Sequence, residues 1–373
     1  MRIFQNRFLQ AVFLLAGTTI GVGMFALPYV FAKAGFFLGL GELLVLTLVT
    51  VAMNWFYGEV IVRTESRHLL PGFVKLYLGK RWFAVESASA FLGFSGGLFV
   101  YVLLGGVFLA NLLGVEPAWG QFFFFLGGIA LVFLNLKGEA EVNYVLTAVM
   151  IGFILILSGL AFRFFDPVHL TGFTPASLYT PYGVILFSLA GGAIIPEVVS
   201  FLKGERRRLR AALALGVIIP AIVYLFFVVA VLGATGGATT PDALGGLLPF
   251  IGKPLFFFGN AIGFLATFTS FILFGFTFRD ILRSDFGMGK IISWFLFAGV
   301  TAVLFLLPLR NFVNIMGFVG AIAIGIDSIF VLWLYEKVRA TRPAVPGYSF
   351  SVPRWAVVLF GVLFFLGFAA PFV

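Results

Sequence analysis

The sequence contains no cysteine and only two histidines, His68 and His169. The absence of cysteine excludes disulfides, thiolate metal sites and cysteine nucleophiles. Charged residues are also scarce, at 10% of the chain against about 25% in soluble domains. The chain has no G-x-x-x-x-G-K-[ST] phosphate-binding loop, which argues against a nucleotide-driven pump. No catalytic constellation is visible either, so we expect neither an enzyme nor a cofactor.

Apolar residues dominate what is present. They make up 61% of the chain, and the mean hydropathy is +1.13. Apolar runs of about 20 residues, long enough to cross a bilayer as helices, recur from end to end. The basic start "MRIFQNR" precedes an apolar stretch too long for a signal peptide, so we expect a retained first helix. The sequence predicts an all-α integral membrane domain over residues 1–373 with eleven spans: 8–31, 36–62, 84–113, 119–136, 142–162, 182–202, 209–232, 255–282, 291–308, 312–334 and 355–373.

The basic residues indicate how these spans are oriented. With a cytoplasmic N-terminus, only Lys33, Arg163, Lys253 and Arg310 of the 24 Lys and Arg residues would lie outside. This asymmetry satisfies the positive-inside rule and predicts an extracytoplasmic C-terminus in the cell (inner) membrane. The run "KGERRRLR" at 203–210 then becomes an inner-loop signal that contacts anionic lipid headgroups, and nucleic acid is not an expected partner.

Two spans contain residues that weaken a helix at mid-membrane depth. "AGTTIGVGMFALP" at 16–28 interrupts helix 1, and Gly191, Gly192 and Pro196 interrupt helix 6 within 186–202. Irregular backbone at this depth occurs where it lines a cavity or is buried in protein. Breaks in the first and sixth spans predict an inverted-repeat transporter with its site at the midplane. The alternative is that both helices are simply glycine-rich and closely packed.

Several motifs carry a resemblance to a known family. "AGTTIGVGMFALP" resembles the first helix of the bacterial hydroxy and aromatic amino acid permeases, the tyrosine and tryptophan permease-like branch of the amino acid/auxin permease group. Further similar segments are "HLLPGFVKLYLGK" (68–80), "GGAIIPEVVSFLKG" (191–204), "LRAALALGVIIPAIVYLFF" (209–227) and "ATFTSFILFGFTFRDIL" (266–282). The resemblance implies a LeuT-type fold of the amino acid-polyamine-organocation superfamily. Its two five-helix repeats would cover residues 8–162 and 182–334, with an extra helix at 355–373.

The family implies symport of neutral, including aromatic, L-amino acids driven by Na⁺ or H⁺. The exposed N–H groups of a broken helix can hold a substrate carboxylate, and freed carbonyls can hold its ammonium group. Tyr101 lies on a helix 3 stripe of small residues, and either contacts substrate or belongs to the core. The predicted substrate-binding residues are Thr18, Thr19, Gly21, Val22, Gly23, Tyr101, Phe187, Ser188, Ala190, Gly191 and Gly192.

A sodium site is implied by the same resemblance. LeuT-type sodium symporters use two adjacent hydroxyl residues on helix 8 together with freed carbonyls of helix 1. Here the ligands would be the carbonyls of Gly17, Ile20 and Ala266 and the hydroxyls of Thr269 and Ser270. The alternative is that these hydroxyls bond back to their own helix.

Carboxylates offer a rival, proton-based coupling. Glu197 follows the helix 6 break and Asp327 lies within helix 10, and a carboxylate at mid-membrane usually has a role or a partner. Glu42 and Glu86 lie near helix ends and are expected at the membrane interface. Glu59 is expected to pair with Arg63, four residues later.

Other functions remain open at this point. A membrane amino acid sensor could use the same fold without net transport, although the tails are short. A channel would need a continuous polar lining, and the helices show isolated polar positions. The expected partners are therefore a small amino acid and the lipid bilayer.

Overall fold

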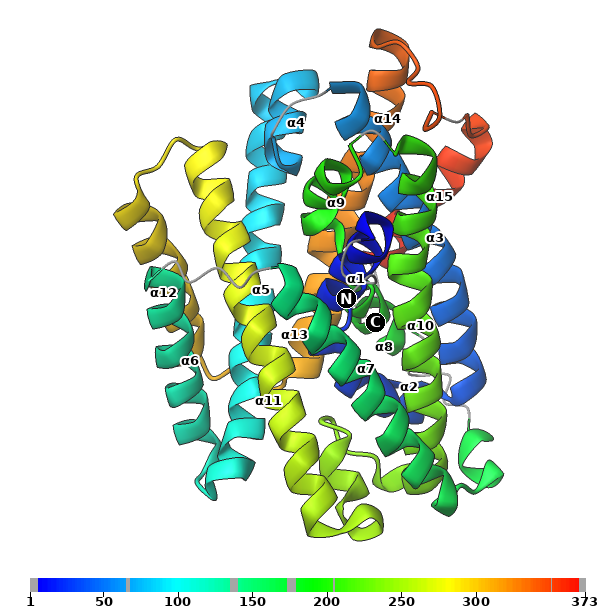
Figure 1. Cartoon of the computed structure of the whole chain (residues 1–373), viewed down its shortest axis with the longest axis vertical. Helices are drawn as coiled ribbons and strands as arrows, with labels where there is room; N and C mark the ends of the chain where they lie inside the picture. Colours follow the sequence, from blue (N-terminus) through cyan, green and yellow to red (C-terminus); the bar gives the residue numbers. More distant parts are fainter. Residues whose placement is uncertain are drawn as a thin grey trace.

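The computed structural model describes residues 6–64, 68–134, 140–172, 179–203, 205–349 and 351–368, apart from the side chains of 140–146. Within these ranges the chain forms helices and loops without a β-strand, in agreement with the all-α prediction (Figure 1). The long helices are α3 (Phe36–Thr64), α5 (Lys80–Leu113), α6 (Pro117–Leu134), α7 (Ala140–Ala161), α10 (Arg206–Thr235) and α11 (Leu244–Ser284). A positive φ of 73° at Gly252 kinks α11 near its start.

Nine segments of the described chain have the length and composition of membrane spans, counting one bent helix pair as a single span. The two remaining predicted spans contain shorter helices, α12 (Lys290–Leu306) with 17 residues and α15 (Arg354–Gly367) with 14. Residues 369–373 of the last predicted span lie outside the described residues. At 1.5 Å per residue, α15 reaches about 21 Å, less than the roughly 30 Å of a hydrocarbon core. The structure thus supports a multi-pass membrane protein, and the count of eleven stays a prediction.

Both predicted helix breaks are present. Helix 1 divides into α1 (Arg7–Thr19) and α2 (Gly23–Ala34), which are bent by 55°. Helix 6 divides into α8 (Thr180–Ser188) and α9 (Ile195–Phe201), separated by the short 3₁₀ turn η5 (Gly192–Ile194). The sequence analysis did not predict a third irregularity in helix 10, where the π-helical turn η7 (Gly320–Ile324) separates α13 (Phe312–Val319) from α14 (Gly325–Thr341).

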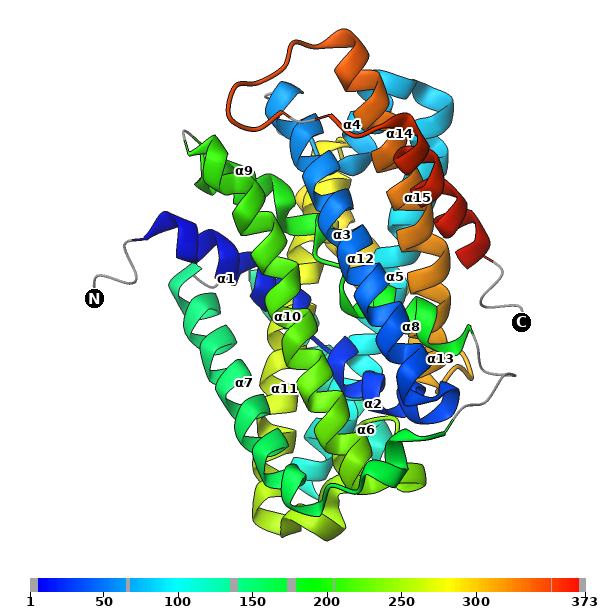
Figure 2. The ribbon, with the colours of Figure 1, turned by 90° about the vertical axis from the view of Figure 1, so that its right-hand side faces the viewer.

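The broken helices lie against one another in the middle of the bundle. Helix α2 packs against α8, and α1 packs against α9 and η5, while α10 contacts α1, α2 and α9. The short helix α4 (Leu70–Leu78) covers one end of the molecule, where α14 ends and α15 begins (Figure 2). Many basic residues sit at helix ends on this side, among them Lys75, Lys80, Arg342 and Arg354. This basic end is the one that the charge pattern assigns to the cytoplasm.

Candidate functional site

Tyr224 joins the two helix breaks through hydrogen bonds. Its fully buried hydroxyl lies 2.6 Å from the Thr19 carbonyl oxygen and 3.0 Å from the Ser188 carbonyl oxygen, at the last residues of α1 and α8. The backbone of Gly21 lies beside the same hydroxyl. Helix ends leave carbonyl and N–H groups without intrahelical partners. The Tyr224 side chain on α10 hydrogen-bonds to one such carbonyl at the end of α1 and to one at the end of α8. The sequence analysis missed Tyr224 because a tyrosine inside an apolar helix gives no local signal of such a role.

Glycines allow the broken helices to approach closely. A Cβ placed on Gly23 would meet Ser188, with its Cα at 2.7 Å. A Cβ on Gly191 would lie 2.7 Å from both Thr19 Oγ1 and a methyl carbon of Leu15. Gly23 is one of the predicted substrate-binding residues, and in the structure it packs between α2 and α8. Its contact with substrate stays a prediction.

Gly21 faces a different pair of groups. A Cβ on Gly21 would lie 3.6 Å from Tyr101 Oη and 3.6 Å from Ser270 Oγ, which is ordinary van der Waals contact. The hydroxyls of Tyr101 and Ser270 are themselves hydrogen-bonded. The break in helix 1 therefore meets α5 (helix 3 of the predicted order) and α11 (helix 8) through small or polar groups.

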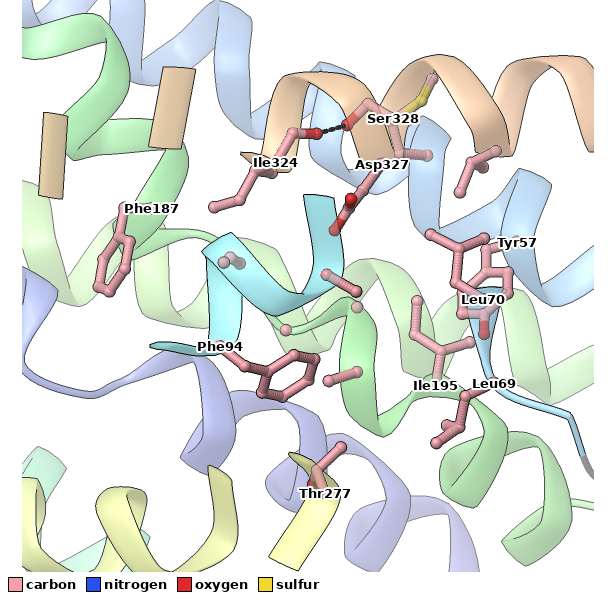
Figure 3. A pocket seen from close by; sticks show the side chains of 18 of the residues that line it. Tyr57, Leu69, Leu70, Phe94, Phe187, Ile195, Thr277, Ile324, Asp327 and Ser328 are labelled. Atoms are coloured by element: carbon pink, nitrogen blue, oxygen red, sulfur yellow. Dashed lines mark hydrogen bonds between the residues drawn. The ribbon is translucent and has the colours of Figure 1, made fainter. Parts of the chain in front are cut away.

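A cavity of about 180 Å³ extends from the breaks toward the end covered by α4. Four helices each present one face to it, with lining positions spaced by three, four or seven residues, as the 3.6-residue period requires. These positions are Thr50, Met53, Asn54 and Tyr57 on α3; Glu86, Ala90, Gly93, Phe94 and Tyr101 on α5; Phe274, Thr277 and Ile281 on α11; and Asp327, Ser328 and Val331 on α14. Figure 3 shows Phe94, Phe187 and Tyr57 around this space, with Asp327 pointing from α14 toward α5.

The predicted substrate-binding residues divide into two groups. Those that line the cavity are Thr18, Tyr101, Phe187, Ala190, Gly191 and Gly192. Those that do not line it are Thr19, Gly21, Val22, Gly23 and Ser188. The second group is packed around Tyr224 and the α2–α8 contact, so the N–H groups at the start of α2 lie behind the cavity wall.

Only some of the predicted sodium ligands lie close to one another in the structure. Ser270 lies near Gly21 in the break of helix 1. Thr269 Oγ1 instead donates to carbonyls of its own helix, at 2.9 Å to Leu265 and 3.2 Å to Ala266. Ile20 is buried and caps α1, and Gly17 is one turn earlier in the same helix. The sodium site stays a prediction.

The carboxylates are arranged differently from the expectation. Asp327 lines the cavity, and its Oδ1 accepts a hydrogen bond of 2.7 Å from Ser89. Glu197 has an exposed side chain on α9 and does not line the cavity. Placing Glu86 at the interface was wrong: its side chain is 0% exposed and lines the cavity. Helix α5 begins four residues before the predicted span, which brings Glu86 two turns into the helix, facing α14.

Two further acidic residues, Glu59 and Glu42, lie on α3. Glu59 pairs with Arg63 at 2.5 Å, as predicted from the spacing of four residues. Glu42 on α3 is half-buried, with Oε2 lacking a hydrogen-bond partner. In the described residues no group of three or more His, Asp or Glu side chains could hold a metal ion.

At the basic end, α4 is attached to the loop that follows α11. The Gly72 N–H donates to Asp285 Oδ2 at 3.2 Å, and His68 Nδ1 lies 3.7 Å from Asp285 Oδ1. Burial raises the pKa of Asp285, although His68 and the Gly72 N–H oppose this shift. Because α4 contributes Leu70 to the cavity lining, this attachment holds one wall of the cavity mouth.

Comparisons with known proteins give the arrangement a context. Residues 4–369 match the tryptophan/tyrosine permease family. Glutamine transporter 2 of Aliivibrio fischeri is 25% identical over 231 residues. That alignment covers 59% of this chain and 59% of the relative, so it spans less than two thirds of the relative's length.

Solved structures share the fold at low sequence identity. MhsT in complex with L-phenylalanine has a TM-score of 0.66 at 13% identity, over 98% of this chain and 97% of that chain. Mhp1, a nucleobase-cation-symport-1 family transporter with bound bromovinylhydantoin, has a TM-score of 0.67 at 12% identity, over 97% and 89%. A manganese transporter of Eremococcus coleocola has a TM-score of 0.64 at 10% identity, over 99% and 86%. These similarities establish a LeuT-type fold for the chain.

Proposed function

Because the chain belongs to the tryptophan/tyrosine permease family, we propose that it is a secondary active symporter of neutral L-amino acids that works by alternating access. The observation that carries this proposal is the cavity that begins where two helices are broken side by side. Broken transmembrane helices offer backbone dipoles to a zwitterion at a depth where charged side chains are costly.

The chemistry of the cavity favours a substrate with a large apolar side chain. Phe94, Phe187, Phe274 and Tyr101 line it, and aromatic walls suit aromatic or long aliphatic groups. Freed carbonyls near Thr18 and Ala190 would accept from the substrate ammonium, and the start of α2 would attract its carboxylate. The relative that carries glutamine and the fold neighbour bound to L-phenylalanine support a neutral amino acid.

The Gly21 backbone lies beside the Tyr224 hydroxyl, so the carboxylate would rely on the N–H groups of Val22 and Gly23. These groups lie behind the cavity wall, and a small movement of α1 and α2 against Tyr224 would uncover them. We therefore expect the described conformation to differ from the substrate-bound one at this break.

We infer the conformational state of the transporter and its orientation in the membrane from the basic end of the molecule. The cavity runs from the breaks to α4, on the side that the positive-inside rule assigns to the cytoplasm. The described conformation would then face inward, in the cell membrane. An ion gradient, Na⁺ or H⁺, would drive accumulation.

Uptake by purified protein in liposomes tests the proposal. Labelled phenylalanine, tyrosine, tryptophan and glutamine should enter the vesicles, and accumulation should require a sodium or pH gradient. Empty liposomes give the background. Saturable binding without uptake under any gradient would indicate the sensor alternative instead, and the absence of both binding and uptake for all four would refute the proposed substrate class.

A further inference from the structure

Glu86 is a fully buried carboxyl group that the substrate site described above does not use. Its side chain is 0% exposed, and both of its oxygens lack a hydrogen-bond partner. It nevertheless lines the cavity. Tyr101, at the helix 1 break, is 15 residues further along α5, which corresponds to about 22 Å of helix. Glu86 therefore belongs to the part of the cavity near α4 and not to the helix breaks.

In the described part of the chain, the charged neighbour of Glu86 is another carboxyl group. Asp327 faces it from α14, and its electrostatic interaction with Glu86 is unfavourable. From α3, Tyr57 faces both carboxyl groups and also Asp285. Among the residues that the structure describes, those that line the cavity include no lysine or arginine.

Four basic residues on the helices packed against α5 contact groups other than Glu86 or are exposed. Lys75 on α4 lies over the ring of Phe83, 5.0 Å from its centroid. Arg279 on α11 donates to the Val132 carbonyl, and Arg339 on α14 pairs with Glu336. Lys290, at the start of α12, is exposed.

Glu86, which has no hydrogen-bond partner, and Asp327, which has one in Ser89, cannot both be ionised in such a place without a cation. Burying a carboxylate away from water without a hydrogen-bond partner is costly, and two like charges repel in addition. In the described residues no third His, Asp or Glu side chain joins these two carboxyl groups in a cluster that could hold a metal ion. A proton needs only one of the two carboxyl groups.

We infer that Glu86 and Asp327 form a proton-binding site that holds one proton in the half of the cavity near α4. Ser89 Oγ lies 2.7 Å from Asp327 Oδ1 and 3.0 Å from the Ala323 carbonyl oxygen, and donating its single proton over the shorter distance favours Asp327 as the ionised partner. Glu86, which receives no hydrogen bond, carries the proton on one of its oxygens. Asn54, 4% exposed with an unpartnered Nδ2, lines the same cavity. Deprotonation releases one H⁺ into the aqueous cavity and leaves the Glu86 carboxylate.

The link from this site to transport rests on the proposed function. One proton bound per cycle at Glu86 would couple the cavity to a pH gradient, separately from any sodium at helices 1 and 8. Glu86→Gln mimics the protonated state permanently. Asp327→Asn removes the neighbouring charge and should let Glu86 lose its proton at lower pH. Glu116→Gln, at an exposed position between α5 and α6, is the matched control.

The first test is infrared difference spectroscopy of the purified full chain during a pH titration. The wild type should show the carbonyl stretch of a protonated carboxylic acid, which disappears as the pH is raised. Glu86→Gln should remove the component of this signal that Glu86 carries, Asp327→Asn should move the midpoint of that component to lower pH, and Glu116→Gln should leave the signal unchanged. Persistence of the signal with an unaltered midpoint in both cavity variants would overturn the proton site.

The second test measures accumulation in liposomes under an inward proton gradient. Glu86→Gln should reduce the accumulation ratio to one, the value of simple equilibration, while exchange of internal for external substrate continues at every pH. Undiminished pH-driven accumulation by Glu86→Gln would contradict the inference. If the infrared signal behaves as expected but no amino acid is bound or moved by the wild type, the proposed substrate fails and the proton site stands.

Discussion

A single hydroxyl group, that of Tyr224, connects the two helix breaks. Tyr224→Phe removes the donor that serves the Thr19 and Ser188 carbonyls, and leaving a buried acceptor unpaired costs about 1–3 kcal/mol. We expect a lower apparent melting temperature in detergent. Tyr182→Phe is the control, because the Tyr182 hydroxyl is buried without a hydrogen-bond partner. Equal melting temperatures for the two variants would show that the Tyr224 bonds do not stabilise the breaks.

The glycines of helix 1 make a second prediction at the scale of residues. Gly23→Ala would force α2 and α8 apart, because its Cβ would lie 2.7 Å from Ser188 Cα. Gly21→Ala leaves its nearest neighbours at 3.6 Å and should be tolerated. Thermal unfolding should therefore show a clear loss of stability for Gly23→Ala and little change for Gly21→Ala. The reverse order would contradict the packing described for Gly23.

At the scale of the elements, the attachment of α4 depends on the buried carboxyl group of Asp285. Asp285 has a raised pKa through burial, so its folded form binds protons more tightly than its unfolded form. This contribution to stability is fully present below the unfolded pKa of about 3.9, and it is lost as the pH rises through the higher folded pKa. Melting temperatures across acidic pH should fall in the wild type as the pH rises.

Asp285→Asn should flatten this fall, because the amide keeps an acceptor for the Gly72 N–H without a charge. Asp166→Asn is the control: Asp166 is exposed and also accepts a backbone bond, from Val168. An unchanged slope in Asp285→Asn would mean that the pH dependence arises elsewhere.

The same elements show what the sequence could predict. Gly, Thr and Pro at mid-span identified both broken helices, because these residues weaken a helix wherever it is packed. Glu86 was misplaced because its distance from a helix end says nothing of which neighbour covers it. The roles of Tyr224 and Ser270 depend on contacts between residues far apart in sequence, and the π-helical turn before Asp327 had no distinct motif.

For the whole molecule, the natural absence of cysteine makes orientation directly measurable. Lys75→Cys on α4 and Val168→Cys in the loop before α8 place single thiols at exposed positions toward opposite ends. An impermeant thiol reagent added to intact cells should label Val168→Cys only. The unmodified chain gives no labelling background, and labelling of Lys75→Cys alone would invert the topology.

The predicted sodium site can be tested by its effect on transport, which involves the whole molecule. Thr269→Ala combined with Ser270→Ala removes both predicted side-chain ligands. Sodium-stimulated uptake should be lost if these hydroxyls hold the ion, while any sodium-free binding remains. Unaltered sodium stimulation would place that ion elsewhere, or limit the hydroxyls to the bonds seen within α11 and with Tyr101.

The central claim is that the amino acid binds in the cavity at the helix breaks. Gly192 lines this cavity, and a Cβ there has no neighbour within 4 Å. Gly192→Phe should therefore fold normally and fill the space. Gly159→Phe adds the same ring at an exposed, equally open position on α7. Equilibrium binding of labelled amino acid to the purified proteins is the most direct measurement: the account predicts wild-type affinity for Gly159→Phe and no detectable binding for Gly192→Phe, and wild-type affinity in a folded Gly192→Phe protein would contradict it.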